Sequence, residues 1–200
     1  MKIGTCVNFS EIDGMEEKFA RLREHNFDSC QLVSWNPAAW TDENANLLKT
    51  LLEQYQITVS AFWCGWTGPA AWNFYDGQLT LGLVPVEYRQ MRIENLCDGA
   101  DFAHKLGITD VVTHMGFIPE NPYDPNFSSF CIAVRTVAEH LKKNGQCLLF
   151  ETGQETPVTM LRCFEAVGTD NLYVNLDTAN LILYGKANPA DALDVFGKYV

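Results

Sequence analysis

Two acidic residues, each at the end of a largely apolar run, are the strongest candidates for chemistry in this chain. Glu151 follows the run 146–150 and Asp177 follows the run 172–176, and both runs have the composition of buried β-strands. A carboxylate in such a place loses hydration and needs a cation or hydrogen-bond donors near it. Two of them at the same end of neighbouring strands predict half of a metal site. Each alone has a simpler interpretation: a Glu before Thr-Gly can be a solvated turn residue, and an Asp before Thr can cap a helix.

Two further polar candidates lie next to predicted strands. His114 is the only one of four histidines that ends a predicted strand, which favours contact with a substrate, with a buried structural histidine as the alternative. Glu155 directly precedes the helix start Thr156-Pro157, so it could bond a substrate hydroxyl or cap that helix. We favour the substrate for both.

Aromatic residues gather in a long stretch, residues 64–86, that separates two predicted strands. A loop of this kind can line a pocket and stack on the apolar face of a sugar ring, or it can pack only on itself. Trp66 is the candidate for substrate binding within the stretch. Trp35 could extend the same wall, or it could pack a helix onto the sheet together with Trp40, and the sequence does not separate the two.

Six short apolar runs are predicted to be the strands that carry these residues. Their nearly unbroken hydrophobicity indicates strands covered on both faces, as in a parallel sheet. Helical patterns lie between them, with caps expected at Asp13, Thr41, Thr156 and Asn188. The predicted strands are residues 2–7, 29–34, 57–63, 110–114, 146–151 and 172–177.

Strict alternation of strands and helices predicts an α/β fold, either a doubly wound sheet or a (β/α)8 TIM barrel. No glycine-rich phosphate loop follows any predicted strand, which disfavours a nucleotide-binding sheet and favours the barrel. Because a barrel has eight strands, we expect residues 1–200 to be a single barrel domain that lacks its last two β/α units.

The composition limits the choice of partners and compartment. A net charge of −11 makes the surface repel phosphate backbones and anionic lipids, so neither nucleic acid nor a membrane is expected as a partner. No apolar run reaches membrane-spanning length, and the first residues lack a signal-peptide layout. Seven cysteines without Cys-x-x-Cys spacing are typical of reduced thiols, so we expect a cytoplasmic protein, with a homo-oligomer left open.

Three segments, residues 111–120, 150–155 and 174–185, carry a resemblance to a known family. They resemble the sugar phosphate isomerase/epimerase family, the xylose isomerase-like TIM barrels, and the resemblance extends over essentially the whole chain. It implies the first six units of that barrel. It also implies an enzyme that isomerises or epimerises a small-molecule sugar, either a keto-sugar or a sugar phosphate, by proton transfer through an enediolate.

The resemblance also implies a metal site. In that family a divalent cation, often manganese, is held by a Glu on strand five, an Asp on strand six, a His on strand seven and a Glu on strand eight. Glu151 and Asp177 match the first two positions, and Glu151 would also transfer the proton. The other two ligands would lie beyond Val200, and magnesium, cobalt and zinc are alternatives to manganese. The cation would stabilise the charge that develops on the sugar carbonyl.

One residue departs from part of the family. Related apurinic-site endonucleases and some ketohexose epimerases have Asp-x-x-His where this chain has Asp177-Thr-Ala-Asn180. Asn180 can bond a sugar hydroxyl but is a poor zinc ligand, which disfavours a multi-zinc endonuclease site.

Three hypotheses for function follow. The first is the isomerase or epimerase. The second is a lyase on the same fold, such as an inosose-type dehydratase or an enzyme that cleaves oxidised glycosides, which the mass of the product would distinguish. The third is a non-catalytic fragment or interaction module, because an open barrel of six units exposes strand edges.

Overall fold

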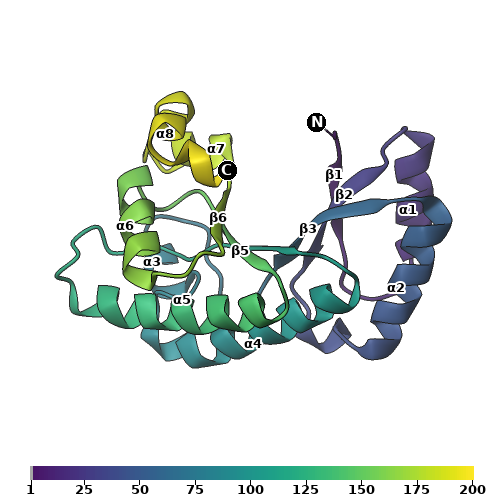
Figure 1. The fold of residues 1–200 in the computed structure, drawn as a ribbon, viewed down its shortest axis with the longest axis horizontal. Helices are drawn as coiled ribbons and strands as arrows, with labels where there is room; N and C mark the ends of the chain where they lie inside the picture. The colour runs from purple at the N-terminus through teal and green to yellow at the C-terminus, as the bar shows by residue number, and fades with distance from the viewer. Residues whose placement is uncertain (1) are drawn as a thin grey trace.

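The core of the protein is one curved sheet of six parallel strands, with helices on its outer side (Figure 1). The computed structural model describes residues 2–200. The strands follow one another in chain order, so β1 and β6 lie at the two edges of the sheet. This alternation of parallel strands and helices confirms the predicted barrel-type α/β fold, here with six strands. The strands are Thr5–Asn8 (β1), Ser29–Ser34 (β2), Thr58–Cys64 (β3), Asp110–Thr113 (β4), Cys147–Glu151 (β5) and Leu172–Asn175 (β6).

The helices begin where polar side chains can cap them. Thr41, Thr156 and Asn188 each accept a hydrogen bond from a backbone N–H in the first turn, as predicted. The cap predicted at Asp13 is wrong, because the first helix begins at Met15 after Gly14, which makes no side-chain cap. The helices are Met15–Glu24 (α1), Asp42–Tyr55 (α2), Gly77–Thr80 (α3), Val86–Lys105 (α4), Pro125–Lys143 (α5), Pro157–Val167 (α6), Thr178–Leu183 (α7) and Pro189–Phe196 (α8), with 3-10 turns at Pro37–Ala39 and Gly197–Tyr199.

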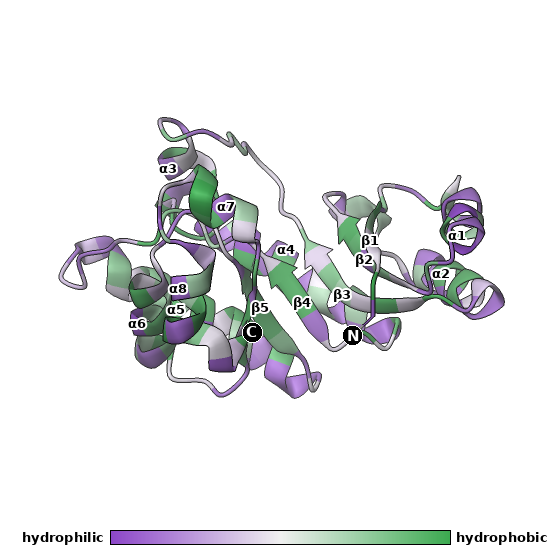
Figure 2. Cartoon of the chain, turned by 90° about the horizontal axis from the view of Figure 1, so that it is seen from above, coloured by the Kyte–Doolittle hydropathy of each residue, from purple (hydrophilic) through white to green (hydrophobic). Residues whose placement is uncertain are grey.

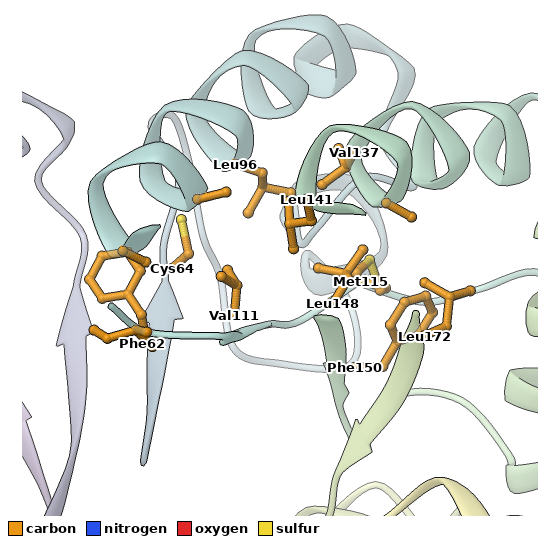
Figure 3. Close-up of a cluster of buried hydrophobic side chains, with 14 of the residues drawn as sticks. Phe62, Cys64, Leu96, Val111, Met115, Val137, Leu141, Leu148, Phe150 and Leu172 are labelled. Carbon is orange, nitrogen blue, oxygen red and sulfur yellow. The ribbon is translucent and has the colours of Figure 1, made fainter. Parts of the chain in front are cut away.

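The main hydrophobic core fills the layer between the sheet and the helices. Leu96 of α4 and Leu141 of α5 point toward Val111 and Leu148 on the sheet (Figure 3), and all four side chains are buried. The central strands β4 and β5 are accordingly among the most hydrophobic parts of the chain, whereas α1 presents hydrophilic residues to solvent (Figure 2). None of the helices described in residues 2–200 is long and apolar enough to cross a membrane.

Alternation along β5 decides which side chains face inward. Leu148 and Phe150 belong to the core against the helices, so Leu149 and Glu151 point to the inner face of the sheet. The same alternation in β3 places Trp63 on the inner face, where it belongs to a second, smaller apolar cluster together with Leu149. The inner face near the ends of the strands is therefore the place where the polar residues meet.

Candidate active site

Glu151 ends β5 and is held by two hydrogen-bond donors from other strands. Its Oε2 accepts from the indole Nε1 of Trp63 at 2.8 Å and from the amide Nδ2 of Asn175 at 2.8 Å. Its Oε1 lies 3.9 Å from Nε2 of His114. Burial raises the pKa of Glu151 to about 7, against the lowering effect of the two donors. The carboxyl can therefore exchange a proton near neutral pH.

Asp177 does not end a strand, and this corrects the sequence prediction. The strand β6 ends at Asn175, which is the residue in register with Glu151. Asp177 caps α7 instead, because its Oδ1 accepts from the backbone N–H groups of Ala179 at 2.8 Å and Asn180 at 3.1 Å. Leu176 continues the apolar pattern of β6, so the pattern alone made the strand two residues too long.

The two acidic side chains still share one site. Glu151 and Asp177 both line a hollow of about 750 Å³ on the inner face of the sheet. The charge of Asp177 contributes to the raised pKa of Glu151, as expected for like charges that lie close together. Thr152 fixes the turn before α7, since its hydroxyl donates to the carbonyl of Asp177 at 2.9 Å and accepts from the N–H of Asp177 at 2.8 Å.

His114 directly follows β4 and lies next to Glu151. Its side chain is buried, and within residues 2–200 its Nδ1 has no hydrogen-bond partner. Burial lowers its pKa to about 4, so the imidazole is neutral at physiological pH. A Cβ at Gly153 would lie 3.4 Å from Cε1 of His114 and 3.6 Å from Cβ of Asn180, so the predicted residues His114 and Asn180 both pack against Gly153.

Four tryptophans form a continuous wall beside His114. Ring centroids lie 5.0 Å apart for Trp35 and Trp63, 5.0 Å for Trp35 and Trp66, and 6.0 Å for Trp35 and Trp72. Trp72 also meets the ring of His114 at 4.9 Å. Trp35 and Trp72 are 36% and 46% exposed, whereas Trp66 is 3% exposed, so Trp66 supports the wall from behind.

Trp40 has a different role from Trp35. Its Nε1 donates to the buried hydroxyl of Ser34 at 2.8 Å, and its ring packs edge-on against Phe62 in the main core. Of the two interpretations that the sequence left open, the wall therefore applies to Trp35 and the packing role to Trp40.

The loop that carries Trp66 and Trp72 is pinned near both of its ends. The guanidinium of Arg92 lies 5.2 Å from the ring of Trp66 and donates to the carbonyl oxygens of Pro69 at 2.8 Å and Gly82 at 2.6 Å. The backbone of Gly82 packs directly against that of Met115, the residue after His114, because a Cβ at position 82 would lie 2.0 Å from the carbonyl carbon of Met115. Between these ends the loop is more exposed.

Glu155 is buried beside the site and does not cap a helix. Its side chain is 2% exposed, and its Oε1 has no partner among the described residues. Thr156 provides the cap of α6, so the capping interpretation of Glu155 is wrong. Burial raises the pKa of Glu155 to about 8, which leaves the carboxyl protonated at neutral pH. Its predicted contact with a substrate stays a prediction.

Comparison with known proteins identifies the family. The model of the family described as xylose isomerase-like TIM barrel matches residues 19–200. The chain belongs to this family. No curated protein matches the chain.

Solved structures with this fold are similar to the chain over nearly its whole length. The chain is 28% identical to a xylose isomerase domain protein from Planctomyces limnophilus, with a TM-score of 0.90, and the match covers 99% of this chain and 71% of that one. A xylose isomerase-like TIM barrel protein from Mycobacterium smegmatis, solved with magnesium, is 20% identical at a TM-score of 0.71, and the match covers 94% of this chain and 65% of that one. A D-allulose 3-epimerase from Methylomonas sp., solved with D-allulose, is 14% identical at a TM-score of 0.73, and the match covers 100% of this chain and 70% of that one.

The carboxylates of this xylose isomerase-like barrel are compatible with a divalent cation but do not make a full site. Within residues 2–200 no group of three or more His, Cys, Asp or Glu side chains is arranged to hold a metal. Glu151 and Asp177 each use one oxygen for the hydrogen bonds described above. Their other oxygens are hard ligands of the kind that magnesium and manganese prefer.

Three inner-face residues were missed in the sequence. Trp63 and Asn175 bind Glu151 directly, and Gln31 of β2 donates to Asn175 Oδ1 at 3.3 Å. The alternation of side chains in β3 is the signal that could have found Trp63, since Trp63 and Glu151 are both inner-face residues near strand ends.

Proposed function

We propose that this protein is a metal-dependent sugar isomerase or epimerase in which Glu151 transfers a proton to and from the carbon next to the sugar carbonyl. The observation that supports it best is the setting of Glu151: a partly buried carboxyl with a pKa of about 7, one oxygen fixed by two donors and the other directed toward His114. A base that must take up and return a proton works best when its pKa lies near the working pH.

Glu151 and Asp177 would hold the cation through their free oxygens. When bound, a divalent cation polarises the sugar carbonyl and stabilises the negative charge that develops as the proton leaves. Two hard ligands bind such a cation weakly, so we propose that they are part of a larger ligand set, whose other members residues 2–200 do not supply. Manganese is the ion we would test first, followed by magnesium.

The remaining residues would bind and orient the sugar. The exposed indole faces of Trp35 and Trp72 offer stacking surfaces for the C–H face of a ring, as tryptophan does in many sugar sites. The amide of Asn180 can bond a hydroxyl group, and His114 would bond one through Nε2, the ring nitrogen that faces Glu151. Both are neutral, which suits a neutral sugar.

The test is isotope exchange in deuterated water with added Mn²⁺ and a panel of ketoses and keto-sugars. We expect deuterium at the carbon next to the carbonyl, and the Glu151→Gln variant should lose the exchange. Glu165→Gln, which changes an exposed Glu on α6, is the matched control and should keep it. Absence of exchange across the panel would overturn the proposal, and a product that has lost water or an aglycone would indicate the lyase instead.

A further inference from the structure

A row of side chains crosses the inner face of the sheet and ends on Glu151. The thiol of Cys6 on β1 donates to Oε1 of Gln31 on β2, with Sγ and Oε1 3.7 Å apart. Gln31 Nε2 donates to Oδ1 of Asn175 on β6 at 3.3 Å, and Asn175 Nδ2 donates to Glu151 Oε2 at 2.8 Å. All three hydrogen bonds therefore run in the same direction, toward the carboxylate.

The chemistry of the amide group sets this direction. An ionised carboxylate only accepts hydrogen bonds, so Asn175 has to present its NH₂ group to Glu151. Its Oδ1 is then turned away and needs a donor, which is the NH₂ group of Gln31. If the Asn175 amide were reversed, its oxygen would face the carboxylate oxygen and the two would repel each other.

The row joins residues that are far apart in the sequence and lie on strands that are not neighbours. Gln31 and Asn175 are 144 positions apart, and their strands β2 and β6 are not neighbours in the sheet. Cys6, Gln31 and Asn175 all line the hollow that Glu151 and Asp177 also line. The packing core lies on the opposite face of the sheet, where Leu32, the residue after Gln31, is buried.

We propose that Gln31 and Asn175 are positioning residues for Glu151. They act with Trp63 to keep Oε2 engaged by two donors, so that Oε1 stays free for the proton or the cation. This inference rests on the role proposed for Glu151. It goes further by assigning a function to a glutamine on a different strand that touches Glu151 only through Asn175.

Two substitutions of Gln31 separate this role from simple packing. Gln31→Met keeps the length of the side chain and removes the donor, so the Asn175 amide loses one restraint but can still donate to Glu151. Gln31→Glu is nearly isosteric and supplies an acceptor in place of the donor. The Asn175 NH₂ group is then drawn toward position 31, and its oxygen is left facing Glu151. A positioning role therefore predicts a larger loss of Mn²⁺ affinity or kcat for Gln31→Glu than for Gln31→Met, although Gln31→Glu is the more conservative change.

The experiment compares both variants with the unchanged protein and with Gln54→Glu. Gln54 is a suitable control because its Nε2 also donates to a carboxylate, Glu16 Oε1 at 3.4 Å, but on the exposed helices α1 and α2. The measurements are the dissociation constant for Mn²⁺ by calorimetry, kcat and KM for the exchange reaction, the urea midpoint of unfolding, and the indole N–H signal of Trp63 by NMR. The last two do not depend on activity.

We expect Gln31→Met to weaken Mn²⁺ binding or kcat about tenfold and Gln31→Glu about a hundredfold, the range found for groups that orient metal ligands. KM and the urea midpoint should stay unchanged, and the indole signal of Trp63 should move in Gln31→Glu as Glu151 turns. Gln54→Glu should match the unchanged protein in every measurement.

Two results would overturn the inference: equal activity and an unmoved Trp63 signal in Gln31→Glu, or losses that follow the urea midpoint. Its failure is distinguishable from failure of the proposed function. If Glu151→Gln abolishes exchange while both Gln31 variants behave normally, only the positioning role is wrong. If Glu151→Gln keeps full exchange, the role of Glu151 itself is wrong, and the inference falls with it.

Discussion

Replacing Glu155 by Gln should stabilise the folded protein increasingly as the pH rises from about 4.5 to about 8. The carboxyl of Glu155 is buried, and burial raises its pKa from 4.5 to about 8. Below pH 4.5 the folded and unfolded states both keep the proton. Between the two pKa values the unfolded state releases it and the folded state does not, so stability from this group is lost as the pH rises through this window.

The size of the effect follows from the width of the window. Each pH unit between the two pKa values lowers the free energy of unfolding by about 1.4 kcal/mol, which amounts to about 3 kcal/mol at pH 7 and about 5 kcal/mol above pH 8. The amide that the Glu155→Gln substitution introduces cannot ionise, so the variant should not show this loss. A constant offset from the extra N–H of the amide would not change the slope.

The assay is urea unfolding followed by tryptophan fluorescence at several pH values from 4.5 to 8.5. Glu151 and His114 titrate in both proteins, so their effects cancel when the free energy of the unchanged protein is subtracted from that of the variant. Glu165→Gln, at an exposed position, should give a difference near zero throughout. A difference between Glu155→Gln and the unchanged protein that does not grow with pH would refute the reasoning.

Substitutions of Trp63, Gly82 and Asp177 test further parts of the structure. Trp63→Phe keeps a ring but removes a hydrogen-bond donor to Glu151, so the pKa of Glu151 should rise above about 7. The pH at which hydrogen exchange is half-maximal should rise with it. A pH profile equal to that of the unchanged protein would contradict this. Gly82→Ala should lower the free energy of unfolding by several kcal/mol, because the φ of Gly82 is +66° and the new Cβ would lie 2.0 Å from backbone. Gly107→Ala, at a φ of +75° but with open space around it, should lower it by only about 1 kcal/mol. Equal losses for the two variants would count against the close contact at Gly82. Asp177→Asn should keep the cap of α7 and the stability of the protein but weaken Mn²⁺ binding. Asp177→Ala should in addition lower the free energy of unfolding by about 1 kcal/mol, because it removes the cap. If the Asp177→Asn variant binds Mn²⁺ with unchanged affinity, Asp177 is only a helix cap.

The sequence predicted the strand positions and Glu151 well, because a buried parallel strand has a strong local signal. The run 29–34 is reproduced residue for residue, and Glu151 ends β5 as predicted. The predicted end of the sixth strand, at Asp177, lies two residues too far along the chain. The reason is that Leu176 prolongs the apolar pattern, whereas Asp177 already caps α7. That shift concealed Asn175, which occupies the register position opposite Glu151.

Contacts across the sheet could not be predicted from local pattern. The hydrogen bond from Trp63 to Glu151 joins residues 88 positions apart, and its existence depends on the curvature of the sheet. The exposure of individual tryptophans could not be predicted either, because Trp66 and Trp72 belong to one loop, and Trp66 is covered by Arg92 whereas Trp72 packs against His114.

The anchoring of the aromatic loop decides which of its residues can be varied without moving His114. Gly82 and its neighbours lie against the backbone that carries His114, and Leu83 N–H donates to the carbonyl of Met115 at 3.0 Å. A replacement there would displace His114 as well as the wall. Residues 73–76, 78 and 79 are exposed, so this part of the loop can be varied independently of His114. For the proposed sugar isomerase or epimerase, libraries that randomise this tip and keep residues 81–83 should change which sugars bind while Glu151 and His114 stay in place.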